Sequence, residues 1–164
     1  MLIQYFKKNK NKDKNLAHKL YKRISKLSNN FVNSNNFFIK KDFETGFEVF
    51  SIFLIIYLKN IKNLKIKNFK KINQDLMDIF INDLDYVFRE KGISDIKLGK
   101  HVKHYVKKFY FRLSNIEKYI NEPDLLNFTE FIKNLKFLKH EKSLDFSEII
   151  FEKFTKIQEE IKTI

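Results

Sequence analysis

The sequence predicts an all-α fold, a single-domain bundle of about six helices around a central αα-hairpin. Three observations favour this fold. The chain has 164 residues, the usual size of one domain with its own core. It contains 3 Gly and 1 Pro, too few turn residues for a many-stranded sandwich or barrel. Its apolar residues recur at intervals of three and four, as they do on one face of a helix.

The chain is expected to begin with a tail and a short helix. Residues 1–15 are rich in Lys and Asn and are predicted to form a basic, flexible tail, while residues 16–164 form the helical domain. An amphipathic helix is expected where five apolar residues share a face: Leu16, Leu20, Tyr21, Ile24 and Leu27. Residues 28–36 consist largely of Asn and Ser, which indicates a loop.

The second helix is expected to lie at the centre of the core. Thr45 and Glu48 have the spacing of a capping box, in which each side chain bonds the other residue's backbone N–H at a helix start. The helix is predicted to run to about Asn60. It is apolar nearly all round, as a helix buried on every side is.

The third and fourth helices are expected to form the hairpin. The third runs from about Asn68 to Lys91, with Gly92 in the left-handed conformation at its end. Ser94 and Asp95 are placed to cap the fourth helix, which reaches about Ile120. One face of the third helix carries a polar stripe: Lys71, Asp75, Asp78, Asn82, Asp85 and Arg89.

Two further helices are expected near the C-terminus. Pro123 suits the first position of the fifth helix, with Asp124 near its positive end. Ser143 is predicted to cap the sixth helix, which ends near Lys162.

Asp83 is a carboxylate on the predicted apolar face of the third helix, so it needs a hydrogen-bond donor. Counting residues back from the turn places it beside His101, His104 and Tyr105, any of which could donate. Arg112 lies roughly 15 Å farther along the hairpin and must have another partner. Arg89 and Arg112 also stand out because only 3 of the 33 basic residues are Arg, which indicates sites that require a planar, bidentate donor.

The sequence contains no support for an enzyme. The absence of Cys excludes disulfides, thiolate metal sites and Cys nucleophiles. His101 and His104 have no third metal ligand at a suitable spacing. No nucleophile elbow, phosphate-binding Gly-rich loop or paired catalytic carboxylates are present. We therefore expect a protein without catalytic activity, metal or cofactor.

The formal net charge is +13, and basic stretches at residues 1–41 and 59–71 flank the apolar second helix. Two interpretations remain open: a solvated Lys-rich surface, or a basic face for RNA or anionic lipid. The apolar stretch at residues 49–58 is too short to span a bilayer. The N-terminus lacks an apolar signal region, so we expect a cytoplasmic location.

Two stretches resemble a known family. Residues 77–112 are similar to the patterns F-x-D-M-D-x-x-L-R-E-M-G-V-G-D, V-G-K and F-Y-G-R of the ubiquinol–cytochrome c chaperone family, and residues 42–54 to its pattern D-T-x-x-G-R-F-E. The resemblance covers residues 20–120. The matching positions in residues 77–112 are Asp83, Asp85, Arg89, Glu90, Gly92, Asp95, Gly99, Lys100, Phe109, Tyr110 and Arg112.

The resemblance implies a non-enzymatic assembly chaperone for cytochrome b and the cytochrome bc1 (ubiquinol–cytochrome c reductase) complex of the respiratory chain. Its implied partners are cytochrome b or other bc1 subunits, the ribosome and, peripherally, the cytoplasmic face of the inner membrane; no DNA partner is expected. The Lys-rich N-terminus differs from Arg- and Ser-rich transit peptides, which favours a bacterial relative. The alternative is a basic helical protein that binds RNA or the ribosome.

The hairpin at residues 77–112 is the expected site of action, because it carries more polar detail than packing requires. The alternative is that Asp83 and Arg112 only fix the register of the helices. The residues expected to bind a partner are Asp83, Asp85, Arg89, Glu90, Asp95 and Arg112.

Overall fold

The computed structural model describes residues 11–163 of the chain and confirms the all-α fold. A short 3₁₀ turn, His140–Lys142, precedes the last helix. The described residues form six α-helices, which are α1 (Asn11–Ser34), α2 (Phe43–Asn63), α3 (Phe69–Glu90), α4 (Asp95–Asn121), α5 (Leu125–Asn134) and α6 (Ser143–Lys162).

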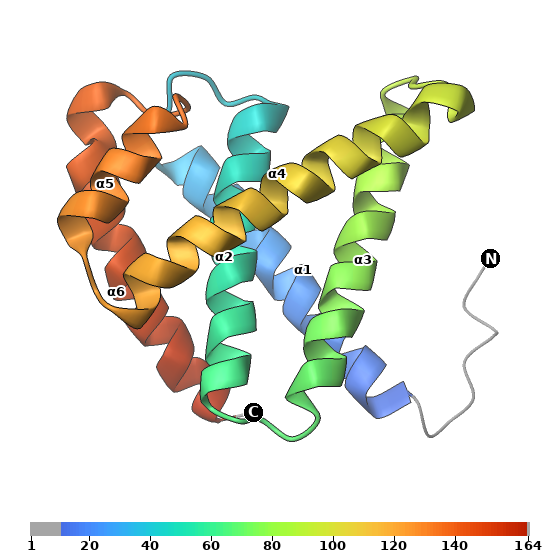
Figure 1. Ribbon diagram of the computed structural model, residues 1–164, viewed down its shortest axis with the longest axis horizontal. Helices are drawn as coiled ribbons and strands as arrows, with labels where there is room; N and C mark the ends of the chain where they lie inside the picture. Colours follow the sequence, from blue (N-terminus) through green and yellow to red (C-terminus); the bar gives the residue numbers. More distant parts are fainter. Residues whose placement is uncertain (1–10, 164) are drawn as a thin grey trace.

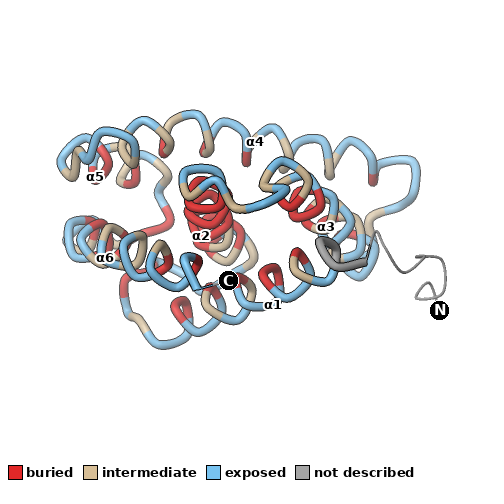
Figure 2. The backbone as a smooth tube through the Cα atoms, turned by 90° about the horizontal axis from the view of Figure 1, so that it is seen from below, coloured by how far each residue is buried: buried red, intermediate tan, exposed pale blue. Residues whose placement is uncertain are grey.

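Helix α2 is the centre of the bundle, as its sequence predicts. It packs against α1, α3, α4 and α6, and nearly every residue from Thr45 to Ile61 is buried. Figure 2 shows α2 and α3 between α4 on one side and α1 on the other. Helices α5 and α6 lie on the side of α2 away from α3 (Figure 1). No described helix has an apolar stretch of the length needed to cross a bilayer.

Helix α1 is longer than its sequence indicates. It begins at Asn11, inside the expected tail, and residues 1–10 of that tail lie outside the described residues. The prediction of a loop at residues 28–36 is wrong for residues 28–34, because the helix continues to Ser34, and only residues 35 and 36 lie outside it. Phe31 in this stretch is buried against Phe53 and Phe146. Ser28 donates to the carbonyl oxygen of Ile24, so this polar side chain fits a helical backbone, and Asn35, just after the helix, donates to the carbonyl oxygen of Phe31 in its last turn.

The start of α2 also differs from the prediction. Its N-cap is Asp42, whose carboxylate accepts a hydrogen bond of 3.0 Å from the backbone N–H of Thr45. The Thr45 hydroxyl donates instead to the carbonyl oxygen of Lys40. Glu48 does not turn back to the helix start, because its carboxylate is bonded to Arg112. The predicted capping box is therefore wrong, and the helix ends at Asn63 rather than Asn60.

The helix ends farther along the chain follow the sequence only in part. Gly92, which follows the C-cap residue Lys91 of α3, has a φ of +78°, as predicted. Ser94 is the N-cap of α4, but its hydroxyl makes no capping hydrogen bond. Asp124, not Pro123, determines the start of α5, because its carboxylate accepts from the N–H of Asn127. Ser143 is the first residue of α6 rather than its cap, and α6 ends at Lys162 as expected.

Candidate functional site

The turn of the α3–α4 hairpin brings three of the predicted site residues together. Arg89 donates from Nε to Asp85 at 2.7 Å and from Nη1 to Asp95, so one guanidinium links the last turn of α3 to the first turn of α4. Both hydrogen bonds raise the pKa of Arg89, the one to Asp85 more than the one to Asp95. All three side chains are exposed, and Glu90 lies exposed beside them. We call these four residues the hairpin tip.

Asp83 lies apart from the hairpin tip. The prediction that it sits on an apolar face beside residues of α4 is wrong, since Asp83 is exposed and accepts a 2.7 Å hydrogen bond from the hydroxyl of Tyr21 in α1. Burial raises the pKa of Tyr21, and the hydrogen bond to Asp83 raises it further. The donor comes from outside the hairpin because α1 packs along α3 as a third neighbour.

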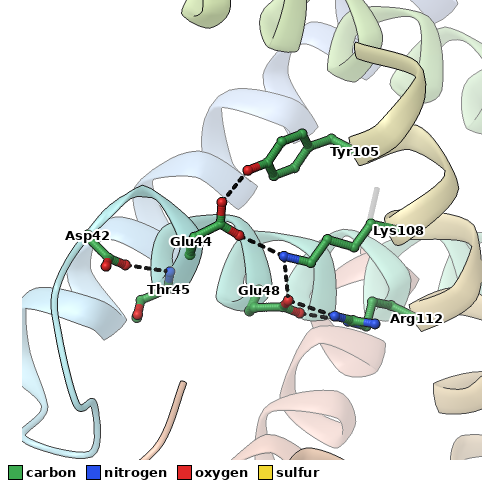
Figure 3. A network of polar contacts seen from close by, with 7 residues as sticks. All are labelled: Asp42, Glu44, Thr45, Glu48, Tyr105, Lys108 and Arg112. Carbon is green, nitrogen blue, oxygen red and sulfur yellow. Dashed lines mark hydrogen bonds and ion pairs between the residues drawn. The ribbon is translucent and has the colours of Figure 1, made fainter. Parts of the chain in front are cut away.

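Arg112 makes a bidentate contact, as the scarcity of Arg in the sequence predicts. Its Nε and Nη2 each donate to a carboxylate oxygen of Glu48 at 2.8 Å, and both side chains are buried (Figure 3). Lys108, one turn earlier in α4, lies 3.1 Å from Glu48 and 2.7 Å from Glu44. Tyr105 donates to the same Glu44. This network attaches the first turns of α2 to the middle of α4.

Burial and the hydrogen bonds of this network shift the pKa values of Glu44 and Tyr105. Burial would raise the pKa of Glu44, but the hydrogen bonds from Lys108 and Tyr105 outweigh it and lower the pKa. Burial raises the pKa of Tyr105, and the hydrogen bond to Glu44 adds to this rise. At neutral pH Glu44 is therefore an ionised acceptor and Tyr105 a neutral donor.

A second ion pair joins the same two helices near the other end of α2. Lys59 is buried and bonds Glu117 of α4, and this hydrogen bond lowers the pKa of Glu117. The two pairs have opposite polarity: in the first α2 supplies the acid, Glu48, and in the second it supplies the base, Lys59. A helix that crossed α2 in another register would leave buried charges unpaired, so the pairs fix how α4 lies across α2.

An apolar groove of about 630 Å³ opens between α2, α4, α5 and α6. Its wall includes the buried side chains of Ile56, Ile116 and Phe128. Glu148 and Glu152, one turn apart on α6, also line it. Both are exposed, and neither takes part in an ion pair among the described residues. Sequence reasoning missed this groove, because it exists only where α6 packs back on α2.

The described side chains contain no cluster of three or more His, Asp or Glu residues that could hold a metal ion. His101 lies against the ring of Phe88, and His104 against that of Tyr105. The buried charges of the α2–α4 contact are matched in pairs. The arrangement can hold helices in register and present an apolar groove with acidic side chains.

Comparison with known proteins gives one family. A family model described as ubiquinol-cytochrome C chaperone matches residues 35–139, which contain α2 to α5 with both ion pairs and the hairpin tip. Phosphomannomutase 2 of Dictyostelium discoideum is 44% identical over 54 residues, 33% of this chain and 22% of that protein. The chain thus spans about a fifth of the length of this relative. No solved structure matches.

Proposed function

Because the chain belongs to the ubiquinol-cytochrome C chaperone family, we propose that it is a non-enzymatic chaperone in the assembly of the cytochrome bc1 complex, with newly made cytochrome b as its client. The observation that carries this proposal is the match over residues 35–139, well over half of the chain. Neither the described side chains nor the sequence supplies a competing catalytic constellation.

The apolar groove supports a client of a particular chemistry. Its apolar wall can take the side chains of a hydrophobic segment, and an amphipathic helix would place anchors there at positions i, i+3, i+4 and i+7. Glu148 and Glu152 complement Lys or Arg beside such a segment. Membrane proteins carry an excess of Lys and Arg in the loops next to their spanning helices on the cytoplasmic side. A segment of cytochrome b at that boundary has the required chemistry.

The hairpin tip is proposed as a second contact, with cytochrome b or another bc1 subunit. Asp85, Glu90 and Asp95 offer exposed carboxylates, and Arg89 holds two of them in fixed positions on two helices. Asp83 and Arg112 have a different role in this proposal. Their side chains are engaged by Tyr21 and Glu48, so they position α3 and α4 rather than touch a partner.

Substitutions at the hairpin tip should separate function from stability. We expect Asp85→Ala, Glu90→Ala and Arg89→Lys to leave the melting temperature nearly unchanged, because exposed ion pairs contribute little to the free energy of unfolding. All three variants should lower the accumulation of cytochrome b. Arg89→Lys should do so because one ammonium group cannot reproduce the two directed hydrogen bonds of the guanidinium. Thermal melts and bc1 levels in a strain carrying each variant test this. Full bc1 assembly in all three would leave the hairpin tip without a role.

A ribosome- or RNA-binding function is the alternative, and the net charge of +13 is the observation that favours it. The two functions differ in their dependence on salt. Phosphate binding by lysines weakens steeply as salt rises, whereas an apolar client held in the groove stays bound. Client capture that persists at high salt is the outcome expected of the chaperone.

A further inference from the structure

The outward side of α4 carries a row of lysines without acidic neighbours on the same stretch of helix. No Asp or Glu occurs between Ile96 and Ile116. Among the described ion pairs, none involves a lysine of this row. Spacings of three and four residues place the row on one side of the helix. We call this side the α4 outer face; its members are Ile96, Lys97, Lys100, Lys103, His104, Lys107, Tyr110 and Phe111.

Large apolar side chains stand exposed on the same face. Ile96 is 95% exposed, and Tyr110 and Phe111 are about half exposed. In Figure 2, α4 forms the outermost layer on its side of α2 and α3, and exposed residues follow its outer edge. From Ile96 to Phe111 the helix rises about 22 Å. The α4 outer face is therefore a long strip in which point charges alternate with apolar side chains.

The strip contains no Arg side chain, because each of the three Arg residues binds a carboxylate at another place in the fold. Arg23 bonds Glu160, Arg89 bonds Asp85 and Asp95, and Arg112 bonds Glu48. RNA recognition relies on Arg for bidentate phosphate contacts and for stacking on bases. A row of lysines attracts a negative surface as point charges. Tyr110 and Phe111 offer rings to a base, but Ile96, the most exposed apolar side chain of the strip, does not. The combination of Lys with exposed Ile, Phe and Tyr is instead typical of helices that lie on a lipid surface.

We propose that the α4 outer face binds the surface of a membrane that contains anionic phospholipid. The lysine ammonium groups lie at the lipid phosphates, and Ile96 and Phe111 enter the boundary between headgroups and acyl chains. In this orientation the bundle rests on the membrane through α4, with α1 on the side away from the lipid (Figure 2). This inference goes beyond the chaperone function, and vesicles without any client test it separately.

The test is flotation of the full chain with vesicles of phosphatidylcholine, with and without phosphatidylglycerol. We expect binding only to the anionic vesicles. A variant with Lys100→Gln, Lys103→Gln and Lys107→Gln should bind them on the order of 100-fold more weakly, given the contribution of each lysine near such a surface. The matched control, Lys19→Gln, Lys22→Gln and Lys26→Gln, removes the same charge from exposed positions of α1 and should change binding far less.

A second variant tests the apolar part of the proposal. Ile96→Ser should weaken vesicle binding several-fold without lowering the melting temperature, because Ile96 is almost fully exposed and packs on nothing. Equal losses in the two lysine variants would show attraction by net charge alone and overturn the proposal. The proposal would also be overturned if the α4 lysine variant lost binding to single-stranded RNA but still bound the vesicles, because the face would then bind RNA.

Discussion

Arg112→Ala should lower the melting temperature by roughly 6–20 °C, the largest loss of stability expected from a charged residue of this chain. The substitution removes both hydrogen bonds to Glu48, which is only 3% exposed and cannot regain water. Breaking a buried pair on one side costs about 3–5 kcal/mol, because the other charge stays buried. Lys108 remains 3.1 Å from Glu48, so we expect the loss toward the lower end of this range.

The double variant distinguishes a buried pair from general damage to the core. Replacing Glu48 and Arg112 together by Met removes both charges and should recover most of the lost stability, since a well-packed apolar pair is often as stable as a buried ion pair. Arg89→Ala, which breaks exposed pairs only, is the control and should melt close to the wild type. If Arg112→Ala also melts with the wild type, the assignment of Arg112 as the residue that positions α4 is wrong.

Reversing the charge beside the apolar groove should have the largest effect on client binding. The double variant Glu148→Lys, Glu152→Lys places two ammonium groups where a basic client segment is expected to approach. Like charges facing each other at an interface cost several kcal/mol, so capture of cytochrome b should fall at least about tenfold. The melting temperature should stay nearly unchanged, because both residues are exposed.

The matched control for this variant is Glu141→Lys with Glu159→Lys. Both residues are exposed, neither lines the groove, and the change in net charge is the same. We expect this control to capture cytochrome b as the wild type does. Equal losses in the two double variants would indicate a response to net charge and would remove the groove from the proposal.

Those features that depend on nearby residues could be predicted from the sequence. Residues 49–58 are apolar on every side, which places α2 at the centre, and Gly92 is found in the left-handed conformation that ends α3. The rarity of Arg indicated bidentate contacts at Arg89 and Arg112. Arg112 makes one, whereas Arg89 makes a single hydrogen bond to each of two carboxylates. The predictions for α2, Gly92 and Arg112 succeeded because the residue type that the local pattern indicates is also the one that the tertiary structure needs at that position.

The errors arose where a distant residue outweighed a local pattern. Glu48 has the spacing of a capping box, but a buried guanidinium 64 positions away binds its carboxylate more strongly than a backbone N–H would. Burial of Phe31 extends α1 through an Asn-rich segment that alone would favour a loop. The donor to Asp83, Tyr21, comes from a helix outside the hairpin. The groove likewise depends on the packing of α6, which no motif in its sequence indicates.

The most direct test of the proposed function is affinity capture from the membranes of the native host. The tagged wild-type chain and the two double variants are each recovered at physiological salt, because high salt would screen the exposed charges at positions 148 and 152. The amount of cytochrome b is compared with that of an unrelated membrane protein. The account predicts that cytochrome b is enriched with the wild type and with Glu141→Lys, Glu159→Lys, and that it falls to background with Glu148→Lys, Glu152→Lys. Cytochrome b at background with the wild-type chain would contradict it.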